Sequence, residues 1–180
     1  MGALKELGHP SQVNLLDYGC GNASMVEFFH GAGFQVIGTD ISQVVIDKNK
    51  SKFPEMDFVL SSADSPLPFP DSSFDAVFSS EVIEHLYDVN FAFSEFNRLL
   101  RPAGLLILTT PYHGLIKNLV IALFYFEKHY RPTWEHIRFF TKKSLTNVCT
   151  ANGFTPIKWT RVGRIPQFAR SLFMTCRKVN

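Results

Sequence analysis

The sequence predicts a doubly wound α/β fold, in which helices cover both faces of a mainly parallel sheet. The first observation is the apolar run Val13–Leu16, which ends at two glycines, Gly19 and Gly21, before the apolar spacing of a helix begins. The second is the next apolar run, 33–39, which ends in Asp40, 19 residues after Gly21, where a carboxylate is placed to bind ribose hydroxyls. The third is the alternation of strand-like and helix-like segments that follows.

Local signals define the other elements in chain order. One helical turn is expected at Leu4–Leu7, and prolines exclude regular structure from 61–73. Longer helices are expected after the N-cap residues Asn22, Ser42, Asp88 and Thr141. Pro54 ends the second of these helices and Gly153 ends the last. Further strands are expected at 56–60, 74–80, 105–109, 154–161 and 169–177, the last two as a hairpin at the sheet edge.

Composition narrows the class of protein. The chain has 180 residues, 46% of them hydrophobic, which is enough for one sizeable core and excludes disorder. A net charge of +2 gives no electrostatic argument for nucleic acid. Three scattered cysteines, Cys20, Cys149 and Cys176, form neither a disulfide framework nor a zinc spacing. Because Met1–Pro10 lacks an apolar signal core and no stretch reaches the length of a membrane span, we expect a cytoplasmic protein.

The glycine turn discriminates between nucleotides. The GxGxxG pattern of dinucleotide sites would need a third glycine at Ser24. Asp17, two residues before Gly19, would face a pyrophosphate as a like charge, at a cost on the order of several kcal/mol at ~4 Å. S-adenosylmethionine (SAM) carries an ammonium and a sulfonium group and no phosphate. The sequence therefore predicts a SAM site and disfavours an NAD-dependent oxidoreductase.

Five motifs occur in order between about residues 13 and 111. They are the stretch DYGCGNA at 17–23, Asp40, Ala63–Phe69, Phe74–Leu86 and Leu100–Leu105. Together they resemble the motifs of class I SAM-dependent methyltransferases. The resemblance implies a Rossmann-like, seven-stranded sheet in the order 3-2-1-4-5-7-6 with strand 7 antiparallel. It also implies a single domain, 1–180, with 111–140 as a lid insertion, SAM as the cofactor and S-adenosylhomocysteine (SAH) as the product.

The resemblance also assigns the cofactor site. Its residues are Asp17, Gly19, Cys20, Gly21, Asp40, Ile41, Ala63, Asp64 and Ser80. Asp17 contacts the ammonium side of SAM, directly or through water, or else only braces the glycine turn. Asp64 accepts the exocyclic amine of adenine, or else is a turn residue before prolines. Ala23 stands where many family members have glycine.

Three residues after the fourth strand are the catalytic candidates. Glu81, Glu84 and His85 are spaced i, i+3 and i+4, so on a helical turn they share one face. We expect them to shape the pocket, with His85 as general base and no metal. The alternative is a Mg²⁺ site on the same three residues, because the spacing is similar to that of ubiquinone-biosynthesis O-methyltransferases.

The acceptor side is expected downstream of the fifth strand. Its candidate residues are Tyr112, His113, His136 and Arg138, although the last two have the alternative role of tying the lid to the core. The apolar stretch Leu119–Phe126 is expected to be a buried cap, with contact of 115–134 with a membrane surface, or a dimer contact, as the alternatives.

We therefore expect a small, fairly hydrophobic acceptor, methylated on oxygen, with no nucleic-acid partner. One alternative is a SAM-binding module without activity, or a partner subunit of an active enzyme. The other is a nucleic-acid base methyltransferase, which is disfavoured because no Asn-Pro-Pro-Tyr-like motif follows the fourth strand. The oligomeric state is left open.

Overall fold

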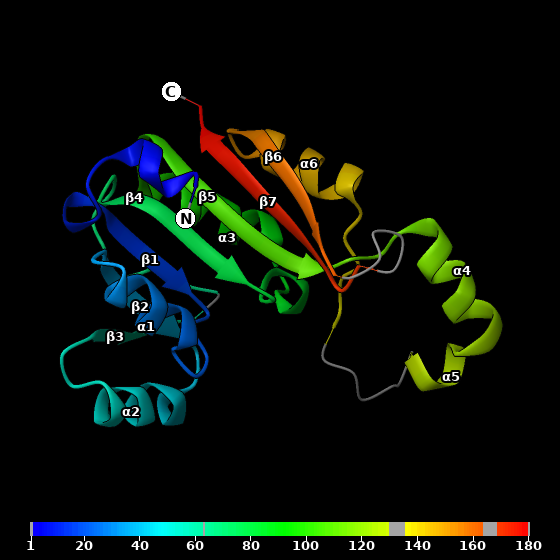
Figure 1. Ribbon diagram of the computed structural model, residues 1–180, viewed down its shortest axis with the longest axis horizontal. Coiled ribbons are helices and arrows are strands. Elements are labelled where there is room, and N and C mark those ends of the chain that lie inside the picture. Colours follow the sequence, from blue (N-terminus) through cyan, green and yellow to red (C-terminus); the bar gives the residue numbers. More distant parts are fainter. Residues whose placement is uncertain (1, 63, 130–135, 164–168, 180) are drawn as a thin grey trace.

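The computed structural model describes residues 2–62, 64–129, 136–163 and 169–179 (Figure 1). Within these residues, seven strands form one sheet in the order β3-β2-β1-β4-β5-β7-β6. The strands are β1 (Asn14–Tyr18), β2 (Gln35–Asp40), β3 (Asp57–Leu60), β4 (Phe74–Ser80), β5 (Leu100–Pro111), β6 (Phe154–Val162) and β7 (Ser171–Lys178). The α-helices are α1 (Ser24–Gly31), α2 (Gln43–Lys52), α3 (Val89–Leu99), α4 (Leu115–Phe124), α5 (Phe126–His129) and α6 (Lys142–Ala151). Short 3-10 helices are η1 (Leu4–Leu7), η2 (Pro10–Gln12) and η3 (Ile83–His85).

The predicted strand order and strand directions are confirmed. β1 pairs in parallel with both β2 and β4, and β3 and β5 extend the parallel sheet on either side. β7 pairs antiparallel with β5 and with β6, so the last two strands form the expected edge hairpin. β5 begins earlier than predicted, because Leu100 pairs with Phe74 ahead of a register shift in the β4–β5 ladder. The carboxyl ends of β1 to β5 therefore meet at one edge of the sheet.

Helices cover both faces of the sheet, as the predicted class requires. Leu15 packs in one apolar cluster with residues of α1 and α2, such as Phe29 and Ile46. Its neighbour Leu16 packs in a second cluster with residues of α3 and α6, such as Phe96. Because successive side chains of a strand point to opposite faces, these two leucines anchor two separate cores.

Three of the four expected N-caps are confirmed. The side chains of Ser42, Asp88 and Thr141 accept backbone N–H groups in the first turns of α2, α3 and α6. The expectation for Asn22 is wrong, because the N-cap of α1 is Ala23, which adopts a left-handed conformation with φ +63°. The Asn22 side chain instead accepts the N–H of Ser24 at 3.2 Å. Glycine is favoured at such a φ, which accounts for the glycine that many family members have at this position; nothing in the structure explains the alanine of this chain.

The α4–α5 segment does not pack as the sequence predicted. Figure 1 shows both helices beyond the carboxyl ends of β4 and β5, apart from the helices that cover the sheet. The expectation of a buried cap is wrong for the described residues, since Ile121 is the one buried side chain of α4. Leu115 and Leu123 are 84% and 65% exposed. None of the helices in the described part of the chain is long and apolar enough to cross a bilayer.

Candidate functional site

The glycine turn after β1 is held by backbone bonds before any ligand binds. The N–H groups of Gly19 and Cys20 both donate to the Thr39 carbonyl, at 2.9 and 2.8 Å. Gly19 has φ +76°, and a Cβ on it would lie 2.4 Å from a methyl carbon of Val82. Glycine is therefore required here both by conformation and by the close approach of the segment after β4.

Asp40 fixes the next turn at the end of β2. One of its carboxylate oxygens accepts the N–H of Gly21 at 3.0 Å, and the other accepts the N–H of Ser42 at 2.9 Å. The side-chain amide of Asn49, on the buried face of α2, donates to the Gly21 carbonyl at 2.7 Å. Sequence reasoning missed Asn49, because a single asparagine 28 residues away from the turn has no local pattern that indicates this contact.

A cavity of about 530 Å³ opens where these turns meet the segment after β4. The residues that line it are Tyr18, Gly19, Asp40, Ile41, Ser61, Asp64, Glu81, Val82, His85, Leu86 and Tyr87. They lie at or just after the carboxyl ends of β1, β2, β3 and β4, and β1 lies between β2 and β4, where the order of the sheet reverses. Ligands of doubly wound folds bind at this topological position.

The predicted cofactor residues do not all line the cavity. Gly19, Asp40, Ile41 and Asp64 line the cavity directly. Asp17, Cys20 and Gly21 lie in or behind the loop, whereas the Ser80 hydroxyl is bonded to that of Thr109 at 2.8 Å. Ala63 lies outside the described residues. Burial, with the nearby Asp17 and Asp40 carboxylates, raises the pKa of the Cys20 thiol to about 12, so this thiol stays protonated and is a poor nucleophile.

Asp17 is a buried carboxyl group that lacks a full set of partners. Its side chain is 1% exposed, and its Oδ2 has no hydrogen-bond partner within the described part of the chain. Burial and the nearby Asp40 carboxylate raise the pKa of Asp17 to about 7. A cationic ligand group beside it would stabilise the charged form. The group thus fits a ligand with an ammonium group, as the sequence predicted.

Glu81 begins the segment after β4 in a strained conformation. Its φ is +55°, which is uncommon for a residue with a side chain. Its N–H donates to the Thr109 carbonyl at 3.0 Å, and its carboxylate accepts the Thr109 hydroxyl at 2.9 Å. The two bonds to β5 hold Glu81 where it lines the cavity. Backbone strain of this kind costs roughly 1–3 kcal/mol and clusters at functional sites.

Glu84 and His85 form a compact group with a residue distant in sequence. The Glu84 backbone carbonyl accepts the N–H groups of Ile137 and Arg138, both at 3.1 Å, which brings His136 beside His85. The two imidazole rings meet edge to face, with centroids 4.8 Å apart. The Glu84 side chain is fully buried, accepts the Thr110 hydroxyl at 3.2 Å, and has a pKa raised to about 7 by burial.

This group differs from the metal alternative that the sequence suggested. A carboxylate oxygen of Glu84 and one ring nitrogen each of His85 and His136 lie within 4.8 Å of one another, and Glu81 is not part of the group. Mg²⁺ prefers oxygen ligands, so a set with two imidazoles fits it poorly. The same set is suited to proton transfer, because imidazole is the commonest general base in proteins and it lies here beside the Glu84 carboxyl group, whose pKa burial raises to about 7.

The predicted acceptor residues are not brought together. Tyr112 and His113 line a separate cleft of about 390 Å³ between the start of α4, the start of α6 and β6. Arg138 donates to the carbonyls of Leu86, at 2.7 Å, and Tyr87, which are both in the wall of the 530 Å³ cavity. Its guanidinium therefore braces that wall, the alternative role considered from the sequence. The ring of His136 lies against that of the catalytic candidate His85.

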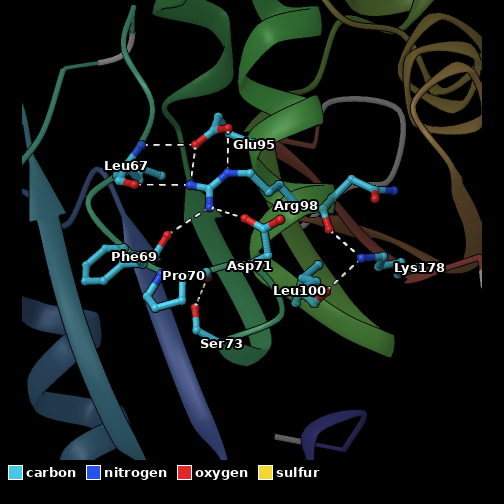
Figure 2. Close-up of polar contacts among 10 residues, drawn as sticks. Leu67, Phe69, Pro70, Asp71, Ser73, Glu95, Arg98, Leu100 and Lys178 are labelled. Carbon is cyan, nitrogen blue, oxygen red and sulfur yellow. Dashed lines mark hydrogen bonds and ion pairs between the residues drawn. The ribbon is translucent and has the colours of Figure 1, made fainter.

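A clamp on α3 holds the loop that carries Asp64 (Figure 2). The guanidinium of Arg98 binds Glu95 and Asp71, each at 2.8 Å, and also donates to the carbonyls of Leu67 and Phe69. Glu95 in turn accepts the Leu67 N–H at 3.0 Å. The ion pair lowers the pKa of Glu95 and raises that of Arg98. Residues 67–71 of this irregular loop are thus fixed by charge-assisted bonds rather than by regular structure.

The fold and this cavity define a class of protein, a doubly wound α/β domain with a carboxylate-lined cavity at the carboxyl ends of its parallel strands. Residues 16–108, just over half of the chain, match the methyltransferase domain family. The chain therefore belongs to this family, the class I SAM-dependent methyltransferases, whose cofactor is SAM.

Individual relatives agree with this family at moderate identity. The chain is 33% identical over 98 residues to a probable S-adenosylmethionine-dependent methyltransferase of Mycolicibacterium smegmatis. The matched region covers 54% of this chain and 38% of that protein. It is 28% identical over 116 residues to a malonyl-[acyl-carrier protein] O-methyltransferase of Pseudescherichia vulneris, and this match covers 64% of this chain and 46% of that protein. The chain thus spans less than half the length of these curated relatives.

A solved structure shares the fold over nearly the whole chain. The SAM-dependent methyltransferase of Mesorhizobium loti superposes with a TM-score of 0.76, covering 98% of this chain and 96% of that one. The sequence identity is 18%, so this likeness shows the fold alone.

Proposed function

We propose that this protein transfers a methyl group from SAM to an oxygen atom of a small, fairly hydrophobic acceptor and leaves SAH. The observation that carries the proposal is the shared cavity, which is lined by Asp40, at the end of β2, and by Glu81 and His85, after β4. A ribose on Asp40 and a nucleophile beside His85 would occupy the same space. Under this proposal residues 1–180 form one methyltransferase domain, with 111–140 as the insertion on its acceptor side.

SAM supplies a methyl group on a positively charged sulfur, which an in-line nucleophile displaces. The residues of the cavity then have two tasks. Asp40 and the glycine turn position the ligand, and Asp17 in its charged form favours the ammonium group of the ligand. His85 accepts the proton of the acceptor hydroxyl as the oxygen–methyl bond forms, and Glu84 stabilises the resulting imidazolium. Hydrogen bonds from the backbone of 137–138 to Glu84 keep this pair in place.

Two features support the acceptor class. The wall beside His85 contains Val82, Leu86 and Tyr87, which favour an apolar body over a charged one. The relative from Pseudescherichia vulneris is an O-methyltransferase by name, which favours oxygen as the atom methylated. Both features concern the acceptor, and neither bears on the SAM site.

The test is methyl transfer from labelled SAM to a panel of phenols, aliphatic alcohols and amines. We expect transfer to a member of the phenol or alcohol groups, whose hydroxyl carries the proton that His85 accepts. His85→Gln should lower the rate about 10²–10⁴-fold, the usual contribution of a general base, while SAH affinity stays the same. The control is His30→Gln, at an exposed position in the last turn of α1. Equal rates for His85→Gln and the unaltered protein, or transfer to amines alone, would contradict the proposal.

A further inference from the structure

The α4–α5 segment presents an apolar face to solvent rather than to a core. Leu115, Leu119 and Leu123 are spaced i, i+4 and i+8, so they lie along one face of α4, and each is more than half exposed. Phe124 and Tyr125 extend this exposed apolar area at the end of the helix. We call these five residues the α4 apolar surface. A helix that packs on its own domain shows the opposite pattern, with leucines buried and polar residues outside.

A cationic cleft adjoins the α4 apolar surface. Lys142 and Lys143, in the first turn of α6, and Arg161, on β6, line the 390 Å³ cleft together with Leu115. The described lining residues include neither aspartate nor glutamate. Lys142 lies over the ring of Trp159 and Arg161 over that of Tyr112, so aromatic faces rather than carboxylates position these two cations.

Charge is distributed very unevenly along the chain. Residues 112–180 contain 12 of the 18 lysines and arginines but only 2 of the 16 aspartates and glutamates. Their formal charge is +10, whereas residues 1–111 carry −8. The net charge of +2 therefore conceals a strongly cationic region that includes both the cleft and α4. Charge asymmetry of this kind indicates an anionic partner surface.

We infer that the α4 apolar surface and the cationic cleft together bind the surface of an anionic lipid bilayer. Interfacial binding combines buried apolar area with electrostatic attraction to anionic headgroups, and both are present side by side. In this arrangement the leucines enter the acyl boundary, while Lys142, Lys143 and Arg161 contact lipid phosphates. The inference goes beyond the proposed function and does not depend on it.

Two other occupants fit the same observations less well. A nucleic acid would match the charge, and the exposed rings of Phe124 and Tyr125 can stack on bases, but the three leucines along α4 offer bases no stacking surface, whereas they suit an acyl boundary. A second copy of the chain would match the apolar face. In a symmetric dimer, however, each patch meets itself, so the two cationic clefts would be brought together.

Flotation with phosphatidylcholine vesicles, with and without phosphatidylglycerol, tests the inference. We expect binding to the anionic vesicles that weakens with salt, and little binding to phosphatidylcholine alone. Leu119→Asn/Leu123→Asn should weaken binding at least tenfold, because both leucines are removed from the acyl boundary. Val44→Asn, an exposed apolar position on α2, is its matched control.

The contribution of the cationic cleft is tested with the double variant Lys142→Gln/Lys143→Gln. Each lysine near an anionic surface contributes enough that losing both should weaken binding roughly thirtyfold. Lys48→Gln/Lys50→Gln, two exposed positions on α2, should leave binding unchanged. Circular dichroism and thermal melting of every variant establish that it is folded, independently of whether SAM binds.

Three results would overturn the inference. The first is failure to bind anionic vesicles, or binding that both double variants retain. The second is salt-sensitive binding of RNA that Lys142→Gln/Lys143→Gln abolishes in the absence of vesicle binding. The third is a dimer in light scattering that Leu119→Asn/Leu123→Asn converts to monomer while vesicle binding is unaffected.

Discussion

The region from β1 to β5 and the region from Tyr112 to β6 differ in whether their functional side chains already have partners within the protein. In the first, Asp40 already accepts two backbone N–H groups, and Glu81 already has its bonds to Thr109. In the second, the leucines of α4 and the lysines at the start of α6 are exposed. The cofactor side is thus preorganised, which reduces the entropy lost on binding. The region from Tyr112 to β6 leaves its apolar and cationic groups available to a partner.

If the cofactor side is preorganised, breaking its clamp should have the largest effect on stability. Arg98→Ala leaves Glu95, which is nearly buried, without its counter-charge. We expect a loss of about 3 kcal/mol in the free energy of unfolding, measured with urea. Arg101→Ala, which breaks the more exposed pair with Asp75, is the matched control and should cost about 1 kcal/mol or less. Similar losses for both variants would show that the 61–73 loop does not depend on the Arg98 clamp.

Substitutions at Gly19 and Gly21 should separate the effect of the left-handed backbone from that of the close contact with Val82. Gly19→Ala places a Cβ 2.4 Å from Val82 and in a left-handed conformation. We expect a loss of roughly 2 kcal/mol in stability and a tenfold or larger loss of SAH affinity, measured by calorimetry. Gly21→Ala is the matched control, because φ is also positive but nothing lies within 4 Å of the added Cβ. If both variants bind SAH equally well, the close approach of Val82 is not important for the site.

The affinity for SAM should depend on pH through Asp17. Its pKa is about 7 without ligand, and a cationic ligand favours the charged form. Below pH 7 binding must first release the proton, so affinity should fall by up to about tenfold per pH unit between pH 7 and pH 5. Above pH 7 it should level off. Asp17→Asn should abolish this dependence, whereas a dependence that persists in Asp17→Asn would assign it to another group.

The raised pKa of Asp17 also makes the stability of the ligand-free protein depend on pH. Between the ordinary pKa of 3.8 and the raised value of about 7, the folded state binds more protons at Asp17 than the unfolded state does. Asp17 therefore lowers the free energy of unfolding as the pH rises through this range.

The smallest effect is expected at Ala23. Ala23→Gly relieves the left-handed strain at φ +63° but removes a buried methyl group and increases the freedom of the unfolded chain. These effects offset each other, so stability should change by about 0.5 kcal/mol or less, and SAM affinity should change by about twofold or less. A tenfold gain in affinity would show instead that the alanine weakens the cofactor turn.

Local signals in the sequence were sufficient to predict most of the turns and helix caps. The caps at Ser42, Asp88 and Thr141 depend on residues within a few positions of each other, so spacing alone predicts them. Gly19 and Asp40 belong instead to a longer motif, whose spacing of 19 residues from Gly21 to Asp40 is visible in the sequence. Asn22 failed as a cap because the left-handed turn at Ala23 delays the helix by one residue. A pattern of residue types does not reveal that change in backbone conformation.

Contacts between distant segments could not be predicted in the same way. The pairing of His85 with His136 depends on hydrogen bonds from 137–138 to Glu84, which join segments about 50 residues apart. The Arg98 clamp joins α3 to an irregular loop, and Arg138 donates to backbone carbonyl groups about 50 residues away. The exposure of α4 was missed for a related reason, because an apolar run does not indicate whether a core lies beside it.

Calorimetric titration with SAM, and separately with SAH, tests most directly whether the cavity beside Asp40 is a SAM site. We expect micromolar binding of both ligands, and its loss in Asp40→Ala, because Asp40 lines the cavity and holds the Gly21 turn. Asp47→Ala, an exposed carboxylate on α2, is the control and should bind as the unaltered protein does. Absence of binding by either ligand, or unchanged binding in Asp40→Ala, would contradict the assignment of this cavity.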